Sequence, residues 1–135
     1  MIKRIKTAGE RDASMLADLT IKEFLEKLGS GFPVPGGGSV AALTAALADS
    51  LTEMMVNLTK SKKGYEAVEE EMKIAAQEAI RFKQKFVLAI DDDSNAYSSV
   101  MSAMRLPGVT EPEKRHREMT IQNGLKQAVL IPMTV

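Results

Sequence analysis

The most informative segment for the fold class is SVAALTAALADSLTEMMVNL, residues 39–58. Alanine covers much of its surface, while leucine and methionine add bulk on several sides. A helix that is apolar over so much of its circumference is typically buried on more than one side. Small side chains also let neighbouring backbones approach closely. The stretch therefore predicts a core helix of an all-α protein.

A loop precedes this helix. Pro33 and Pro35 cannot lie inside a helix, and Gly36, Gly37 and Gly38 follow them directly. Ser39 then stands where a helix N-cap is expected.

A shorter helix lies further upstream. Thr20 is a good N-cap, and Glu23 three residues later completes a capping box. Leu19 and Phe24 occupy the hydrophobic-staple positions, and Gly29 is expected to end the helix.

Downstream, apolar residues recur at helical spacing from Tyr65 to about Met104. This pattern predicts either one long helix or two nearly collinear ones. After a loop over residues 105–112, a last helix is expected over about residues 113–129, with Pro132 as its stop. Its residues predicted to face the core are Met119, Leu125 and Val129.

These elements predict an all-α, up-and-down multihelical bundle. The very apolar helix has few long partners within the chain, so we expect the core to be completed by a second subunit, through homodimerisation, or by further chain. Residues 1–18 have weak periodicity and are predicted to form an N-terminal arm or leader before a single helical domain over residues 19–135.

Composition argues against several functions. Eighteen basic and eighteen acidic residues give no formal net charge, so neither nucleic acid nor an acidic membrane is expected as a partner. With no cysteine and a single histidine, we expect no thiol chemistry and no histidine metal site. We find no uninterrupted apolar run long enough to span a bilayer and no signal-peptide core, so we expect a cytoplasmic protein.

Three consecutive aspartates, residues 91–93, interrupt the long predicted helix. The core direction of this helix is defined by an apolar stripe of Phe86, Ile90, Tyr97, Met101 and Met104. At about 100° per residue, Asp93 falls within about 40° of that stripe. Asp91 lies about 120° and Asp92 about 140° away from that stripe, on the flank and the outer face. A carboxylate among apolar neighbours needs a dedicated partner, or desolvation raises its pKa into the range useful for proton transfer. Asp93 is therefore either a structural cap or ion-pair residue, or an acid/base candidate.

Two further features each have two interpretations. Glycines before a helix can form a turn, or they can expose N–H groups to a ligand at the positive end of the helix dipole. Lys60, Lys62 and Lys63 form a basic cluster, which indicates either a solvated turn or a site for a polyanionic tail. His116 is expected at the surface, and we assign it no role.

Four sequence blocks resemble the cyclodeaminase/cyclohydrolase family, which includes formimidoyltetrahydrofolate cyclodeaminase and methenyltetrahydrofolate cyclohydrolase. They occur in the family's order and cover roughly residues 19–132. The blocks are PVPGGGSVAAL, LTKSKKGYE, IDDDSNAYSSVMSAMRLP, and EKR with IQNGLKQAVLIP.

The resemblance implies an all-α homodimer that binds a tetrahydrofolate derivative in a cleft near the subunit interface. It implies no metal and no cofactor beyond that folate substrate. By position in the blocks, Asp93 corresponds to the catalytic acid/base candidate. Asp91 corresponds to the first aspartate of the family's D-x-D block and is assigned to the catalytic site with Asp93. The substrate-binding residues that it implies are Pro35, Gly36, Gly37, Gly38, Ser39, Lys62, Lys63 and Tyr65.

Two reactions fit this resemblance. One closes 5-formiminotetrahydrofolate to 5,10-methenyltetrahydrofolate with release of ammonia, and the other hydrolyses the methenyl compound to 10-formyltetrahydrofolate. The chain departs from the family pattern at Ser61, where glycine is usual, at the inserted charge of Asp92, and at its end, because family members continue with further helices. The alternative is therefore a catalytically inactive, truncated relative that acts as a folate-binding or helical dimerisation module.

Overall fold

The computed structural model describes residues 15–60 and 62–133, and no strand occurs within those ranges. The predicted all-α class is confirmed. In chain order, the elements are η2 (Leu16–Asp18), α1 (Ile21–Leu28), α2 (Gly37–Thr59), η3 (Glu66–Val68), α3 (Glu69–Met104) and α4 (Glu111–Met133).

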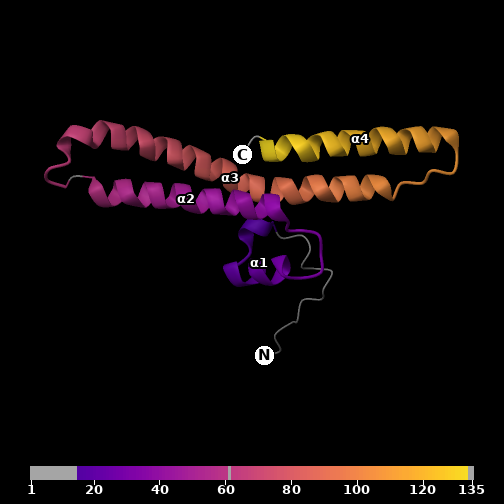
Figure 1. Ribbon diagram of the computed structural model, residues 1–135, viewed down its shortest axis with the longest axis horizontal. Helices are drawn as coiled ribbons and strands as arrows, with labels where there is room; N and C mark the ends of the chain where they lie inside the picture. Colours follow the sequence, from indigo (N-terminus) through magenta and orange to yellow (C-terminus); the bar gives the residue numbers. More distant parts are fainter. Residues whose placement is uncertain (1–14, 61, 134–135) are drawn as a thin grey trace, which may run out of the picture.

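Helix α3 is the long axis of the molecule, and the helices run up and down along it (Figure 1). Helix α2 lies along the first part of α3, and α4 returns along its last part (Figure 1). The sequence left open one long helix or two collinear ones, and the structure has one continuous helix of 36 residues. The aspartate triplet lies in the middle of this helix, close to the start of α2.

Local sequence signals explain how α1 begins. The hydroxyl of Thr20 accepts the N–H of Glu23, and the Glu23 carboxylate accepts the N–H of Thr20, so the predicted capping box is confirmed. Phe24 is buried, and Leu19 packs against the same core cluster. The box fixes how the chain enters α1.

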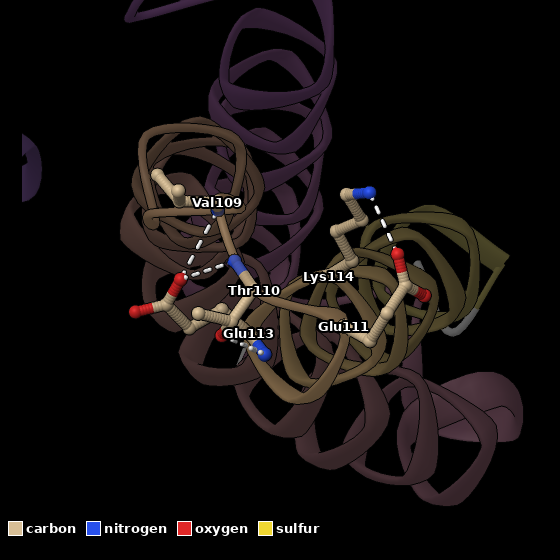
Figure 2. Close-up of polar contacts among 5 residues, drawn as sticks. All are labelled: Val109, Thr110, Glu111, Glu113 and Lys114. Atoms are coloured by element: carbon tan, nitrogen blue, oxygen red, sulfur yellow. Dashed lines mark hydrogen bonds and ion pairs between the residues drawn. The ribbon is translucent and has the colours of Figure 1, made fainter.

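A second capping box begins α4, and the sequence analysis missed it because Pro112 was assigned to the preceding loop. Figure 2 shows the Glu113 carboxylate accepting the N–H groups of Val109 and Thr110, at 3.1 and 2.8 Å. The N–H of Thr110, then its side chain, lowers the pKa of Glu113. The last helix therefore begins before Pro112, and it also runs beyond Val129 to Met133, so the predicted stop at Pro132 was wrong.

The start of α2 differs from the prediction. Its N-cap is Gly36, and the first helical hydrogen bond runs from the N–H of Val40 to the carbonyl of Gly36 at 3.1 Å. Ser39 therefore lies in the first turn of the helix, where backbone N–H groups have no partner within the helix. The prediction that Ser39 is the N-cap was wrong.

The core gathers where η2, α1, α2 and α3 meet. It is a cluster of five buried apolar side chains: Leu16, Phe24, Ala42, Ala89 and Ile90. Residues 1–14 of the predicted arm lie outside the described residues, whereas Leu16 is buried in this cluster. The last part of the predicted arm thus packs on the domain.

Much of the bulky apolar surface lies outside this core. Within the chain, α2 buries chiefly small residues, while leucines and methionines on its other side are exposed, so the expected burial on several sides is not met. We call these residues the α2 apolar face: Leu47, Leu51, Met54, Met55 and Leu58.

Helix α4 likewise leaves its bulky apolar side chains exposed and packs through a small residue. Met119 is 67%, Leu125 41% and Val129 61% exposed, so the prediction that they face the core was wrong. The reason is close packing of small residues: a Cβ on Gly124 would lie 3.1 Å from Val100 of α3. The glycine side of α4 therefore faces α3, and the bulky residues point away.

By length and composition alone, α2 is long and apolar enough to cross a membrane, with a mean hydropathy of 1.3 over its most apolar window. The sequence expectation concerned an uninterrupted apolar run, and α2 is interrupted by Asp49 and Glu53. The finding is weak evidence for a membrane span, because the core helix of a soluble protein meets the same criterion. Glu53 of α2 forms an ion pair with Lys83 of α3.

Candidate functional site

The structure brings Asp93 to the glycine loop. Its Oδ2 atom accepts the backbone N–H of Ser39 at 3.0 Å and lies 3.2 Å from the Ser39 hydroxyl. Asp93 is half-buried, as the sequence predicted for this position. A carboxylate at the first turn of α2 also complements the positive end of the helix dipole. Asp93 thus has a dedicated partner, which was one of the two expected outcomes.

Gly38 makes this contact possible. A Cβ built on Gly38 would lie 2.0 Å from Oδ1 of Asp93 and 2.4 Å from its carboxyl carbon. No side chain fits at that distance, so the carboxylate occupies the space that the missing Cβ leaves. By contrast, a Cβ on Gly37 would meet nothing within 4 Å. One of the three glycines is therefore required by packing against Asp93.

Ser39 connects the loop to α3 by further hydrogen bonds. Its hydroxyl lies 2.8 Å from the carbonyl oxygen of Ile90 and 3.0 Å from the hydroxyl of Ser94. Ser39 is completely buried, and Ser94 nearly so. Sequence reasoning missed Ser94, although a serine directly after the aspartates, on a helix side that also carries Ile90, was a visible signal.

Asp91 has different partners from Asp93. Its two carboxylate oxygens accept the N–H of Leu16 at 2.5 Å and the N–H of Ala17 at 3.1 Å. The sequence placed Asp91 on the helix flank but did not predict its burial: η2 docks on that flank and leaves Asp91 only 8% exposed. The structure thus places Asp91 as an anchor of the N-terminal turn; its predicted catalytic role stays a prediction. Asp92 is exposed, as expected.

The other predicted substrate-binding residues fall into two groups. Pro35 is buried, Gly36 is half-buried and Gly37 is exposed, and all three lie beside Gly38 and Ser39 at the start of α2. Lys62, Lys63 and Tyr65 instead lie beyond the other end of α2. Ser39 and Thr59 are twenty positions apart along α2, which is roughly 30 Å at 1.5 Å per residue.

Lys62, Lys63 and Tyr65 line a pocket of about 380 Å³ between the end of α2 and the start of α3. Two more lysines, Lys60 and Lys73, line the same pocket. Lys73 also contacts Glu69 and Glu70, and these carboxylates raise its pKa. The sequence-predicted site thus forms two separate regions within one chain, an acidic centre at Asp93 and a basic pocket.

Among residues 15–60 and 62–133, no group of three histidine, cysteine, aspartate or glutamate side chains is placed to hold a metal ion. The chemistry available at the glycine loop is that of one carboxylate, one hydroxyl and the free N–H groups of a helix start. This set suits proton transfer beside a polar ligand.

Comparisons with known proteins show which sequences and folds this chain resembles. A sequence model of the formiminotransferase-cyclodeaminase family matches residues 20–135. Over 88% of the chain, 38% of residues are identical to a methenyltetrahydrofolate cyclohydrolase of Methylorubrum extorquens, and 57% of that protein is covered. The whole chain aligns with a formimidoyltransferase-cyclodeaminase of Gallus gallus at 33% identity, covering 25% of that longer protein.

A solved structure of a similar protein has the same fold over most of this chain. The formiminotetrahydrofolate cyclodeaminase of Thermotoga maritima superposes with a TM-score of 0.71 and 35% identity, over 87% of this chain and 54% of that one. The chain thus spans a little over half the length of this structure and of the cyclohydrolase. With the family match over residues 20–135, these similarities show that the chain belongs to the formiminotransferase-cyclodeaminase family.

Proposed function

We propose that this chain is a folate-dependent one-carbon enzyme, with Asp93 as its acid/base group. It either cyclises 5-formiminotetrahydrofolate to 5,10-methenyltetrahydrofolate or hydrolyses the methenyl compound to 10-formyltetrahydrofolate. The observation that carries the proposal is the half-buried Asp93 carboxylate held against the glycine loop by Ser39, in a chain of this family.

In the cyclisation, N10 attacks the formimino carbon, and a bond forms between them. The bond from that carbon to the formimino nitrogen then breaks, and the nitrogen leaves as ammonia. It takes up the proton that N10 loses and one further proton, so the reaction consumes one proton in total. Asp93 would accept the first proton and return it to the leaving nitrogen, because an unprotonated amide ion is a very poor leaving group.

In the hydrolysis, water adds to the methenyl carbon, and the bond from that carbon to N5 breaks. N5 keeps one of the water protons and the other is released, so the same carboxylate serves first as base and then as acid. Neither reaction as written requires a metal. The N–H groups of Gly37 and Gly38 are candidates to orient the pterin or a carboxylate of the substrate. The N–H of Ser39 is already donated to Asp93 and is not free for that task.

We further propose that a homodimer completes the site. The α2 apolar face is five exposed leucines and methionines in one chain, and burying such side chains is favourable by about 1.5–3 kcal/mol each. If two α2 helices pack antiparallel about a two-fold axis, the end of one helix lies beside the start of the other. The basic pocket of one copy would then approach Asp93 of its partner.

A second candidate is a family member without turnover that binds folate or serves as a dimerisation module. It is favoured by one observation, that the Asp93 carboxylate already has a structural partner in the N–H of Ser39. Both candidates predict a dimer, so only turnover separates them.

The deciding experiment follows the methenyl absorbance with each folate in turn. A rise with 5-formiminotetrahydrofolate indicates a cyclodeaminase, and a fall with 5,10-methenyltetrahydrofolate above the uncatalysed rate indicates a cyclohydrolase. Asp93→Asn should abolish either signal while circular dichroism and the unfolding midpoint stay close to those of the wild type. Full turnover in Asp93→Asn would overturn the role of Asp93, and no turnover in a folded dimer would favour the second candidate.

A further inference from the structure

The two oxygens of the Asp93 carboxylate are in different surroundings. Oδ2 receives the N–H of Ser39 and lies within reach of its hydroxyl. Oδ1 lies against the Cα of Gly38 and accepts no hydrogen bond from the part of the chain that the structure describes. Because Oδ2 already accepts from Ser39, a proton added to this carboxylate is expected on Oδ1.

Besides the Ser94 hydroxyl, which can serve as donor or acceptor, the hydroxyl proton of Ser39 has two acceptors within reach. The carbonyl oxygen of Ile90 is 2.8 Å away and Oδ2 of Asp93 is 3.2 Å away. Hydroxyl protons rotate to the better acceptor, and an ionised carboxylate accepts more strongly than a neutral group. The hydroxyl of Ser94, at 3.0 Å, is positioned to donate to the Ser39 oxygen in either state.

We propose that Ser39 is a positioning residue for Asp93, and that its buried hydroxyl turns toward Oδ2 when the carboxylate is ionised and toward the Ile90 carbonyl when it is protonated. Oδ1 is then the oxygen that exchanges the proton with the substrate. This inference rests on the proposed function only where it concerns turnover. The hydrogen-bond exchange itself is a property of this chain without substrate.

The rotation of the Ser39 hydroxyl stabilises the site both before and after Asp93 gives up its proton. When Asp93 gives up its proton from Oδ1, the Ser39 hydroxyl breaks its bond to Ile90 and forms one to Oδ2. When the proton returns, the bonds exchange back, so the buried Ser39 hydroxyl has an acceptor at both stages.

The first test is kinetic. Ser39→Ala keeps the backbone N–H and removes the hydroxyl, so we expect kcat to fall on the order of tenfold while KM stays within about twofold. Ser39→Cys keeps nearly the same side-chain volume and a weak donor, so its kcat should lie between that of Ser39→Ala and that of the wild type. This variant keeps the test decisive if Ser39→Ala folds poorly. Ser50→Ala is the matched control, because the Ser50 hydroxyl bonds only to the carbonyl of Ala46 within α2, at 2.7 Å.

The second test needs no turnover. In protein labelled with ¹³C at aspartate carboxyls, the Asp93 resonance is assigned by its loss in Asp93→Asn. At a pH where the carboxylate is ionised, that resonance should shift in Ser39→Ala and stay in place in Ser50→Ala.

An unmoved resonance in Ser39→Ala overturns the proposal, whatever the activity. A moved resonance with an unchanged kcat, or with a change in KM alone, overturns the positioning role. If the wild type turns over neither folate, the proposed function fails, while the resonance still decides whether Ser39 holds Asp93 through its hydroxyl.

Discussion

The backbone N–H of Ser39 donates to the carboxylate of Asp93 at 3.0 Å, across 54 positions of sequence. The bond joins the first turn of α2 to the middle of α3. It also explains why residue 38 is a glycine, because the Asp93 carboxylate fills the place that a Cβ on residue 38 would occupy. One backbone contact thus determines both the start of the core helix and the orientation of the candidate acid/base group.

This contact predicts that Gly38→Ala impairs turnover without unfolding the protein. The new Cβ would lie 2.0 Å from Oδ1, so the carboxylate must move. A displacement of about 1 Å at a reacting group can cost on the order of 10²-fold in rate. We expect a loss of that size in kcat, measured by the methenyl absorbance.

Gly31→Ala is the matched control for that substitution. A Cβ on Gly31 would meet nothing within 4 Å, so turnover should stay at the wild-type level. Equal kcat values for Gly38→Ala and the wild type would contradict the packing argument.

Asp91→Asn should destabilise the fold. The Asp91 carboxylate satisfies two N–H groups of η2, and the amide side chain offers only one oxygen for them. A buried donor left without a partner costs about 1–3 kcal/mol. Urea unfolding should show a loss of that order, whereas Asp92→Asn, on the exposed neighbouring residue, should stay within about 0.5 kcal/mol of the wild type. Unchanged stability of Asp91→Asn would argue against its role as an anchor.

Local signals were enough to predict part of this structure. The capping box of Thr20 and Glu23 is contained within four residues, so the sequence displays it in full. The half-burial of Asp93 also followed from helical geometry alone. The burial of Asp91 did not, because it depends on η2 docking from 75 positions away.

The apolar pattern was less informative for a different reason. Periodicity identifies a helix face that avoids water, but it does not say whether this chain or another molecule covers that face. The predicted stripe of α3 included Tyr97 and Met104, which are 40% and 43% exposed. The contact with α4 uses small residues such as Gly124 instead, and these contribute little to a hydrophobic pattern.

The second capping box predicts a pH dependence of stability. The pKa of Glu113 is lowered, so its contribution is fully present above the ordinary carboxyl value of 4.5 and is lost as the pH falls through the lower folded value. At pH 7 the wild type should therefore unfold at a higher temperature than Glu113→Gln. The difference should shrink toward zero in acid.

Glu118→Gln, on an exposed residue of the same helix, controls for the loss of a charge. It should give no such pH-dependent difference. A gap between the wild type and Glu113→Gln that is the same at pH 7 and in acid would contradict the capping argument.

The α2 apolar face predicts self-association. Leu51 is 60% exposed in the middle of this face, so Leu51→Glu would place a charge inside any interface that the face forms. In sedimentation equilibrium, the wild type should have twice the 14.7 kDa mass of one chain, and Leu51→Glu should shift toward the single-chain mass. Val109→Glu changes a residue that is 86% exposed outside this face, and it should sediment as the wild type does.

Because the two parts of the predicted site are roughly 30 Å apart along α2, a monomeric Leu51→Glu should also lose turnover. Full activity in that monomer would show that one chain forms a complete site and would remove the need for a partner's basic pocket.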